Sequence, residues 1–291
     1  MKEAKIMSIT IRKLTENIGA EITGIDITQP IDDAAFAPIF DAFNEYSVLV
    51  FHDQDFTDDQ QVAFSQHFGA LETTVKSNIG GGTYIADISN VDPETDEILP
   101  VDSWRIVYNS GNEMWHTDSS FKPVPALASL LSGREVPPEG AETEFGSMRA
   151  AYASLTSAEQ ERLEGLVAVH DFSYSRGLVD PELLDDEHKN ETPPVRQAVV
   201  RVNPVNGKKG FYTGSHASHI VDWPVEEGRA LLKDLVARAT RPEFTYSHKW
   251  QAKDLVIWDN RCVLHRGQSW DKARYRRVMH RTTVAGDGPT A

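Results

Sequence analysis

Two segments that lie far apart in this chain carry side chains suited to one metal ion, and their separation constrains the fold. The first is His116-Thr117-Asp118, and the second ends at His265, 149 residues after His116. Successive side chains of a β-strand point to opposite faces, so we expect His116 and Asp118 to project the same way. Two histidines and one carboxylate form a facial triad that holds Fe(II) and leaves coordination positions open. Because the third ligand is so distant, both halves of the chain must meet in one core.

The remaining pattern favours a single β-rich domain over residues 8–285. Alternating or wholly apolar runs predict short strands at 8–14, 20–27, 47–51, 84–88, 126–134, 143–145, 199–202, 210–213, 243–250, 255–259 and 276–285. Helices are predicted after the capping boxes at Thr57 and Thr156, after Asp32 or Asp33, and over the amphipathic stretch 225–240. Many short strands with a few peripheral helices suit a double-stranded β-helix (a jelly roll, as in cupins), whose mouth can hold a metal.

Three segments are candidates for lid loops beside such a site. They lie near residues 72–82, 92–111 and 178–194. The first ends in Gly80-Gly81-Gly82, the second has no clear periodicity, and the third is acidic and contains prolines. Loops of this kind next to a binding site are often mobile.

Composition limits the partners of the chain. Its 291 residues include 29 basic and 44 acidic side chains, which gives a net charge of −15. This charge argues against binding to nucleic acid or to an anionic membrane surface, and an anionic substrate must be held by local basic residues. Cys262 is the only cysteine, and no run of about 18 apolar residues occurs. We therefore expect a cytoplasmic protein in a reducing compartment.

Several motifs together resemble a known family. They are Trp115-His116-Thr117-Asp118, Thr143, the segment from Trp258 to His265, and Arg277 followed by Arg281-Thr282-Thr283. This set is similar to the taurine dioxygenase family of Fe(II)/2-oxoglutarate-dependent oxygenases, with the strongest likeness to its 2,4-dichlorophenoxyacetate dioxygenase branch. The likeness extends from about Ile9 to about Ala285.

The resemblance implies a role for each matching residue. The catalytic iron ligands would be His116, Asp118 and His265. Thr143 and Arg277 would bind the distal carboxylate of the co-substrate 2-oxoglutarate, a task that suits a hydroxyl and a guanidinium fork. Arg276 is adjacent and stays open as the alternative arginine. The residues that fall where the family contacts its acidic primary substrate are Lys76, Asn112, Ser119 and Arg281.

The implied reaction couples O2 and the oxidative decarboxylation of 2-oxoglutarate to hydroxylation of a small anionic aromatic substrate. On an aryloxyalkanoate, hydroxylation beside the ether oxygen would give a phenol and glyoxylate, with succinate and carbon dioxide. Two alternatives stay open: oxidation of another small acid, such as a sulfonate or an alkyl sulfate, and a cupin-like module that binds 2-oxoglutarate without turnover. Assembly into a homo-oligomer also stays open. We interpret His216-x-x-His219 as structural or as part of a cavity rim, because no third ligand accompanies it.

Overall fold

The larger of two facing sheets collects strands from the whole length of the chain. The structure is a computed structural model that describes residues 9–75 and 81–291. Seven strands follow the order β1-β2-β3-β13-β5-β15-β4, and every neighbouring pair is antiparallel except β2 and β3. In sheet order they are β1 (Thr10–Lys13), β2 (Ala20–Thr23), β3 (Val48–Phe51), β13 (Leu255–Asp259), β5 (Ala128–Glu135), β15 (Val278–Val284) and β4 (Ala86–Ser89).

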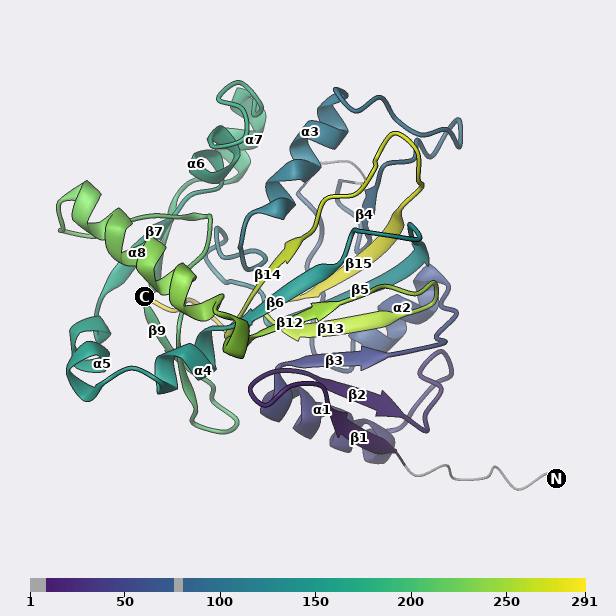
Figure 1. Ribbon diagram of the computed structural model, residues 1–291, viewed down its shortest axis with the longest axis horizontal. Helices are drawn as coiled ribbons and strands as arrows, with labels where there is room; N and C mark the ends of the chain where they lie inside the picture. The colour runs from purple at the N-terminus through teal and green to yellow at the C-terminus, as the bar shows by residue number, and fades with distance from the viewer. Residues whose placement is uncertain (1–8, 76–80) are drawn as a thin grey trace.

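The smaller sheet has the strand order β12-β6-β14, and Figure 1 shows it running alongside β5, β13 and β15 through the centre of the molecule. Its antiparallel strands are β12 (Thr245–His248), β6 (Thr143–Ser147) and β14 (Val263–Gly267). The strand β14 contains His265 and was absent from the strands expected from sequence. Its pattern is mixed, with buried Val263 and Leu264 followed by half-buried Arg266 and Gly267.

The strand β13 is buried on both faces, and its alternation assigns one face to each of two cores. Val256 and Trp258 pack with Phe145 of β6 between the two sheets. Leu255 and Ile257 pack on the opposite face against the helices α1 (Asp33–Tyr46) and α2 (Asp58–Ser65). A continuous apolar run such as Leu255 to Trp258 is what a sheet covered on both sides requires. This sandwich of sheets confirms the jelly roll predicted from the sequence.

The helices α1 (Asp33–Tyr46) and α2 (Asp58–Ser65) begin where the sequence places their caps. The Asp32 side chain accepts a hydrogen bond from the Ala35 amide, and Thr57 forms the expected capping box with Gln60. These contacts satisfy amide donors that a helix start leaves free. Both helices then bury their apolar side chains on the outer face of the large sheet.

The middle of the chain forms a second layer beside the sandwich. A three-stranded sheet and a hairpin pack with three helices there: β7 (Val167–His170), β8 (Val195–Ala198), β11 (Ala217–Ile220), β9 (Val200–Val202), β10 (Lys209–Phe211), α4 (Met148–Ala153), α5 (Ser157–Leu163) and α8 (Val225–Ala239). The β9–β10 hairpin around Asn206-Gly207 and the capping box of α5 are confirmed.

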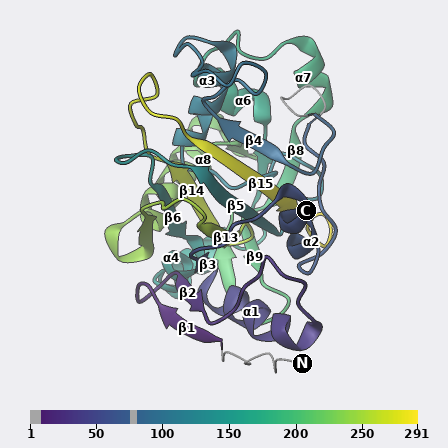
Figure 2. The same cartoon turned by 90° about the vertical axis from the view of Figure 1, so that its right-hand side faces the viewer.

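Two segments expected to be irregular carry helices that close one end of the molecule. They are α3 (Trp104–Ser110) and α7 (Asp186–Glu191), which lie close to α6 (Phe172–Gly177) at the top of Figure 2. The Trp104 indole donates to the Leu183 carbonyl at 3.1 Å, and Leu183 is buried with Tyr108 and Phe172. The expectation of irregular structure was wrong here, because scattered apolar side chains in each polar segment find one another only after folding.

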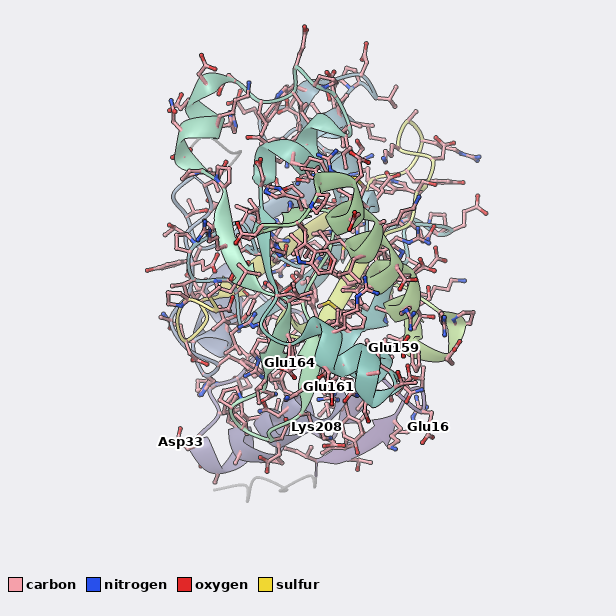
Figure 3. All side chains as sticks on the ribbon, turned by 90° about the vertical axis from the view of Figure 1, so that its left-hand side faces the viewer. Glu16, Asp33, Glu159, Glu161, Glu164 and Lys208 are labelled. Atoms are coloured by element: carbon pink, nitrogen blue, oxygen red, sulfur yellow. The ribbon has the colours of Figure 1, made fainter. Side chains whose placement is uncertain are left out.

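The outer surface carries the acidic excess. Figure 3 labels Glu159, Glu161 and Glu164, which project from α5 and its C-terminal end. Two of them are partnered by basic side chains, Glu159 by Arg238 at 2.9 Å and Glu164 by Lys209 at 2.6 Å. Over the described ranges 9–75 and 81–291, none of the helices combines the length and the apolar character needed to span a bilayer.

Candidate active site

The backbone around His116 and His265 brings the two histidines side by side. The His116 amide donates to the His265 carbonyl at 3.0 Å, and the His265 amide donates to the His116 carbonyl at 2.8 Å. This is an isolated bridge, and Asp118 lies in the turn that follows it. The expectation of a regular strand across His116 and Asp118 was therefore wrong. The turn reverses at Ser119, whose φ of 53° is left-handed, a strained conformation that often accompanies a functional site.

The three side chains nevertheless converge. One ligand atom each from His116, Asp118 and His265 lies within 4.8 Å of the others, and all three residues are buried. His265 Nε2 is 3.6 Å from Asp118 Oδ2. His116 Nδ1 lies 2.8 Å from the Met114 carbonyl, so Nδ1 carries the proton and the lone pair of Nε2 is available to a metal. This is the usual support for a metal-binding imidazole.

The protonation states suit metal binding. Burial lowers the pKa of His116 and takes the pKa of His265 well below its ordinary value. Burial alone would raise the pKa of Asp118, but the positive charge of Arg281 and the two imidazoles outweigh it and hold that pKa below its usual range. At neutral pH the site therefore offers two neutral imidazoles and one carboxylate, the forms that coordinate a metal.

A buried hydrogen-bond network fixes Asp118. Ser129 donates to Asp118 Oδ2 at 2.7 Å and accepts from the Asn260 amide nitrogen at 2.9 Å. The Asn260 oxygen accepts from the Asp118 backbone amide and from the Trp258 indole, both at 3.0 Å. Sequence reasoning did not assign Ser129, which lies on β5, and gave Asn260 no role beyond its motif.

Arg281 occupies the opposite side of Asp118. Its Nη1 lies 2.5 Å from Asp118 Oδ1, and the side chain lines cavities on both sides of the three converging residues. We name these the Thr143 cavity, lined by Thr143, Trp258, His265, Trp270 and Arg277, and the aromatic cavity, lined by Tyr108, Phe121, Phe172, Arg176 and Asp118. His116, Asn112 and Arg281 line both.

The Thr143 cavity holds the two residues expected to bind 2-oxoglutarate. The Trp250 indole donates to Thr143 Oγ1 at 2.9 Å, which leaves the hydroxyl proton of Thr143 available to an acceptor. The Arg277 guanidinium stacks on Trp270 at 5.2 Å, and its Nε has no hydrogen-bond partner. Burial lowers the pKa of Arg277 to about 10, so it stays charged at neutral pH. Arg276 lies outside the cavity and pairs with Asp96 and Glu135.

The aromatic cavity contains some of the residues expected to contact the primary substrate. Asn112 and Ser119 line it together with Arg281. Ser119 Oγ donates a hydrogen bond to Glu72 Oε2 at 2.7 Å, and Asn112 Oδ1 accepts one from Arg176 Nη2 at 3.3 Å. Lys76 lies outside the described residues. Arg176 is a buried guanidinium in this cavity that sequence reasoning missed, since nothing in Ser173-Tyr174-Ser175-Arg176 marks it as different from a surface arginine.

The donor set fits the metal that the resemblance implies. Two imidazoles and one carboxylate on one side of a site are the ligands of non-haem Fe(II) oxygenases. The orphaned Nε of Arg277 is a donor available to a carboxylate in the cavity next to His265. The fold and the site thus define the class as a mononuclear non-haem Fe(II) oxygenase on a jelly roll.

Comparison with known proteins agrees. The family described as taurine catabolism dioxygenase TauD, TfdA family matches residues 10–283. An alpha-ketoglutarate-dependent 2,4-dichlorophenoxyacetate dioxygenase of Cupriavidus pinatubonensis is 40% identical over 283 residues, covering 96% of this chain and 98% of that protein. An (S)-phenoxypropionate/alpha-ketoglutarate-dioxygenase of Sphingobium herbicidovorans is 34% identical, covering 95% of each chain.

The solved structures agree as well. The crystal structure of AAD-2 in complex with Mn(II) and N-oxalylglycine matches with a TM-score of 0.90 and 43% identity, covering 98% of this chain and 99% of that chain. The chain therefore belongs to the taurine catabolism dioxygenase TauD, TfdA family, and it is a dioxygenase. The resemblance drawn from the sequence motifs is confirmed.

Proposed function

We propose that the protein is an Fe(II)/2-oxoglutarate-dependent dioxygenase that hydroxylates an aryloxyalkanoate, such as 2,4-dichlorophenoxyacetate, beside its ether oxygen. The observation that carries the proposal is the placement of two cavities beside one His-Asp-His cluster, each with a buried arginine available to an acid. One cavity would take the co-substrate and the other the primary substrate. The names of the relatives, which act on 2,4-dichlorophenoxyacetate and phenoxypropionate, support this substrate class.

The reaction balances with these reactants. One oxygen atom of O2 enters succinate as 2-oxoglutarate loses carbon dioxide, and the other replaces a C–H bond of the substrate with C–OH. The hydroxylated carbon then carries both a hydroxyl and the aryloxy group. This hemiacetal breaks the bond between the hydroxylated carbon and the ether oxygen. The oxygen stays on the ring and takes up the hydroxyl proton, which releases the phenol and leaves glyoxylate.

The chain's own residues bind and orient the reactants. The bound Fe(II) supplies activation of O2, and His116, Asp118 and His265 would hold it. Arg277 and the Thr143 hydroxyl bind the distal carboxylate of 2-oxoglutarate, since both are donors in one buried cavity. Ser129 and Asn260 keep Asp118 in position through the network described above.

The wider expectations are part of the proposal. Residues 8–285 are proposed as one catalytic domain, with lids near 92–111 and 178–194. The third lid expected from the sequence, near 72–82, lies partly outside the described residues. Lys76, Asn112, Ser119 and Arg281 contact the primary substrate. The enzyme works in the cytoplasm, in keeping with a single cysteine, Cys262, that is buried and has its pKa raised to about 11 by burial.

A substrate panel tests the proposal. The protein is loaded with Fe(II) and 2-oxoglutarate and offered 2,4-dichlorophenoxyacetate, both enantiomers of a 2-phenoxypropionate, an alkyl sulfate and taurine. We expect succinate and a phenol in equal amounts from at least one aryloxy acid. Efficient succinate formation with taurine or the alkyl sulfate, and no phenol from any aryloxy acid, would refute the substrate class and leave the cofactor chemistry standing.

A further inference from the structure

Arg176 is an arginine at the end of α6 whose side chain is turned into the protein. Only 5% of it is exposed, and its guanidinium lies between two aromatic rings, 4.8 Å from the centre of Tyr108 and 4.9 Å from that of Phe172. Both rings, like Arg176 itself, line the aromatic cavity beside His116 and Asp118. A charge so far from water needs compensation.

Among the described residues, Arg176 has only neutral partners. Asn112 Oδ1 accepts from Nη2 at 3.3 Å, and the Nε atom has no hydrogen-bond partner. The acids that line the same cavity are committed to other cations at 2.5–2.7 Å: Asp118 to Arg281, Glu72 to Lys122, and Asp87 to Arg105. Within the described ranges, the cavity therefore has one positive charge without a counter-ion.

The neighbouring backbone is shaped to admit this guanidinium. Gly111 has a φ of −57°, which any residue adopts, so its conformation does not require glycine. A Cβ atom at this position would lie 1.5 Å from Arg176 Nη1. The absent side chain is what allows the guanidinium to lie here, between the end of α3 and the cavity.

The Thr143 cavity repeats this arrangement. Its one acid, Glu113, pairs with Lys272 at 2.5 Å, and Arg277 is left without a carboxylate partner among the described residues. The proposed reaction brings two organic acids to the metal. Among the described residues, one buried guanidinium without a counter-ion lines each of the two cavities beside the His-Asp-His cluster.

We propose that Arg176 binds the carboxylate of the primary substrate, a small aromatic acid, an assignment that rests on the proposed function. The role deepens the expectation that placed this contact on Lys76 and Arg281. Arg281 is already paired with the Asp118 carboxylate, whereas the partners of Arg176 among the described residues are neutral side chains and its Nε has no hydrogen-bond partner. The rings of Phe121 and Phe172, 4.4 Å apart, give the aryl group an apolar wall. Binding supplies the counter-ion that a buried guanidinium needs.

The test compares an acid with a neutral analogue. Titration calorimetry on the Mn(II)-loaded protein measures binding of 2,4-dichlorophenoxyacetate, of 2-(2,4-dichlorophenoxy)ethanol and of 2-oxoglutarate. In Arg176→Gln we expect the Kd of the acid to rise about 10- to 100-fold, the loss typical of a charge-assisted contact. The Kd values of the neutral alcohol and of 2-oxoglutarate should change less than about twofold. Arg176→Lys should recover part of the affinity, because it restores the charge without the fork.

A second variant and a control keep the outcome interpretable. Gly111→Ala leaves every charge in place but displaces the guanidinium, so it should weaken acid binding in the same direction. Arg201→Gln removes another arginine that stacks on a ring, at 4.6 Å from Tyr212, and lines neither cavity, so acid binding should be unchanged. Thermal unfolding of each variant checks that the fold is retained.

Three failures are distinguishable. If Arg176→Gln binds the acid as tightly as the wild type while Arg281→Ala does not, the anchor is Arg281 and the assignment to Arg176 is wrong, although the substrate class stands. If the wild type neither binds nor converts any aryloxy acid, the proposed function fails and the assignment fails with it. Equal losses for the acid and the neutral alcohol in Arg176→Gln would mean that Arg176 only supports the cavity wall, which also overturns the assignment.

Discussion

The two cavities beside the His-Asp-His cluster share His116, Asn112 and Arg281, yet they are built from different kinds of structure. The Thr143 cavity is walled mainly by the sandwich, because Thr143 lies on β6, Trp258 on β13 and His265 on β14. The aromatic cavity is walled mainly by short helices and loops, namely α3, α6 and the segments 72–75 and 116–122, with a smaller part from β4 and β15. Strands paired on both sides hold side chains rigidly, whereas short helices and loops vary with less cost to the fold. The contrast suits an invariant co-substrate on one side and a particular substrate on the other.

The largest effect should come from removing His116, because this proposed metal ligand lines both cavities. In His116→Ala we expect no succinate, with or without an aryloxy acid, and loss of Fe(II) or Mn(II) binding in calorimetry. The fold should survive, as circular dichroism can check. His219→Ala is the control, since His219 hydrogen bonds with Ser218 and lines neither cavity. Turnover at the wild-type rate in His116→Ala would remove the metal centre from this position.

A substitution in the Thr143 cavity alone should change the KM for one reactant and leave the KM for the other almost unchanged. Arg277→Ala removes a charge-assisted contact worth about 1.5–3 kcal/mol, so the KM for 2-oxoglutarate should rise about 10- to 150-fold. The KM for the aryloxy acid should change little, because Arg277 does not line the aromatic cavity. Arg276→Ala is the matched control: its side chain pairs at the surface with Asp96 and Glu135. A larger effect from Arg276→Ala would place the co-substrate arginine one residue earlier.

Removing a hydrogen bond that positions Asp118 should lower the affinity for the metal, even when no substrate is bound in either cavity. Ser129→Ala deletes the hydrogen bond to Asp118 Oδ2 and removes the acceptor of the Asn260 amide. Changes to such supporting groups cost about 10- to 100-fold in metal affinity or activity. Mn(II) titration without any substrate measures this directly. Ser132→Ala on the same strand is the control, because Ser132 Oγ donates to Gln61 Oε1. Equal metal affinity in both variants would contradict a positioning role for Ser129.

His170, which lines neither cavity, should make the free energy of unfolding depend on pH. Burial and the Arg201 charge lower the pKa of His170 to about 3 from 6.5, and neither ring nitrogen has a hydrogen-bond partner. Between those pH values the unfolded chain binds more protons, so the free energy of unfolding falls as pH drops below about 6.5. From about pH 7.5 to about pH 5, His170 should account for about 2 kcal/mol of that fall.

Urea unfolding of the wild type and His170→Phe at both pH values checks this contribution. The stacking partner of His170 is Tyr212, whose ring centre lies 5.5 Å away, so a phenyl ring should retain that contact. We expect the variant to lose less stability than the wild type on acidification. Identical losses in the two proteins would show that His170 does not carry this pH dependence.

Local patterns were sufficient for much of the fold. Capping boxes at Thr57 and Thr156 and the turn at Asn206-Gly207 encode their structure within a few residues, and the structure reproduces all three. The apolar run from Leu255 to Trp258 indicated a buried strand, and β13 is buried over its whole length. The metal residues could also be chosen from sequence, because so few residue types coordinate Fe(II).

The tertiary structure decided the properties that depend on which distant residues become neighbours after folding. His116 and His265 become neighbours through a bridge between chain segments 149 residues apart, and a turn rather than a strand brings Asp118 to them. The helices α3 and α7 form where scattered apolar residues meet across the fold. Above all, sequence gave no means of distinguishing Arg176 from the surface arginines. Burial and the pairing of nearby acids with other cations set the environment of a charge, and both arise only when distant segments pack together.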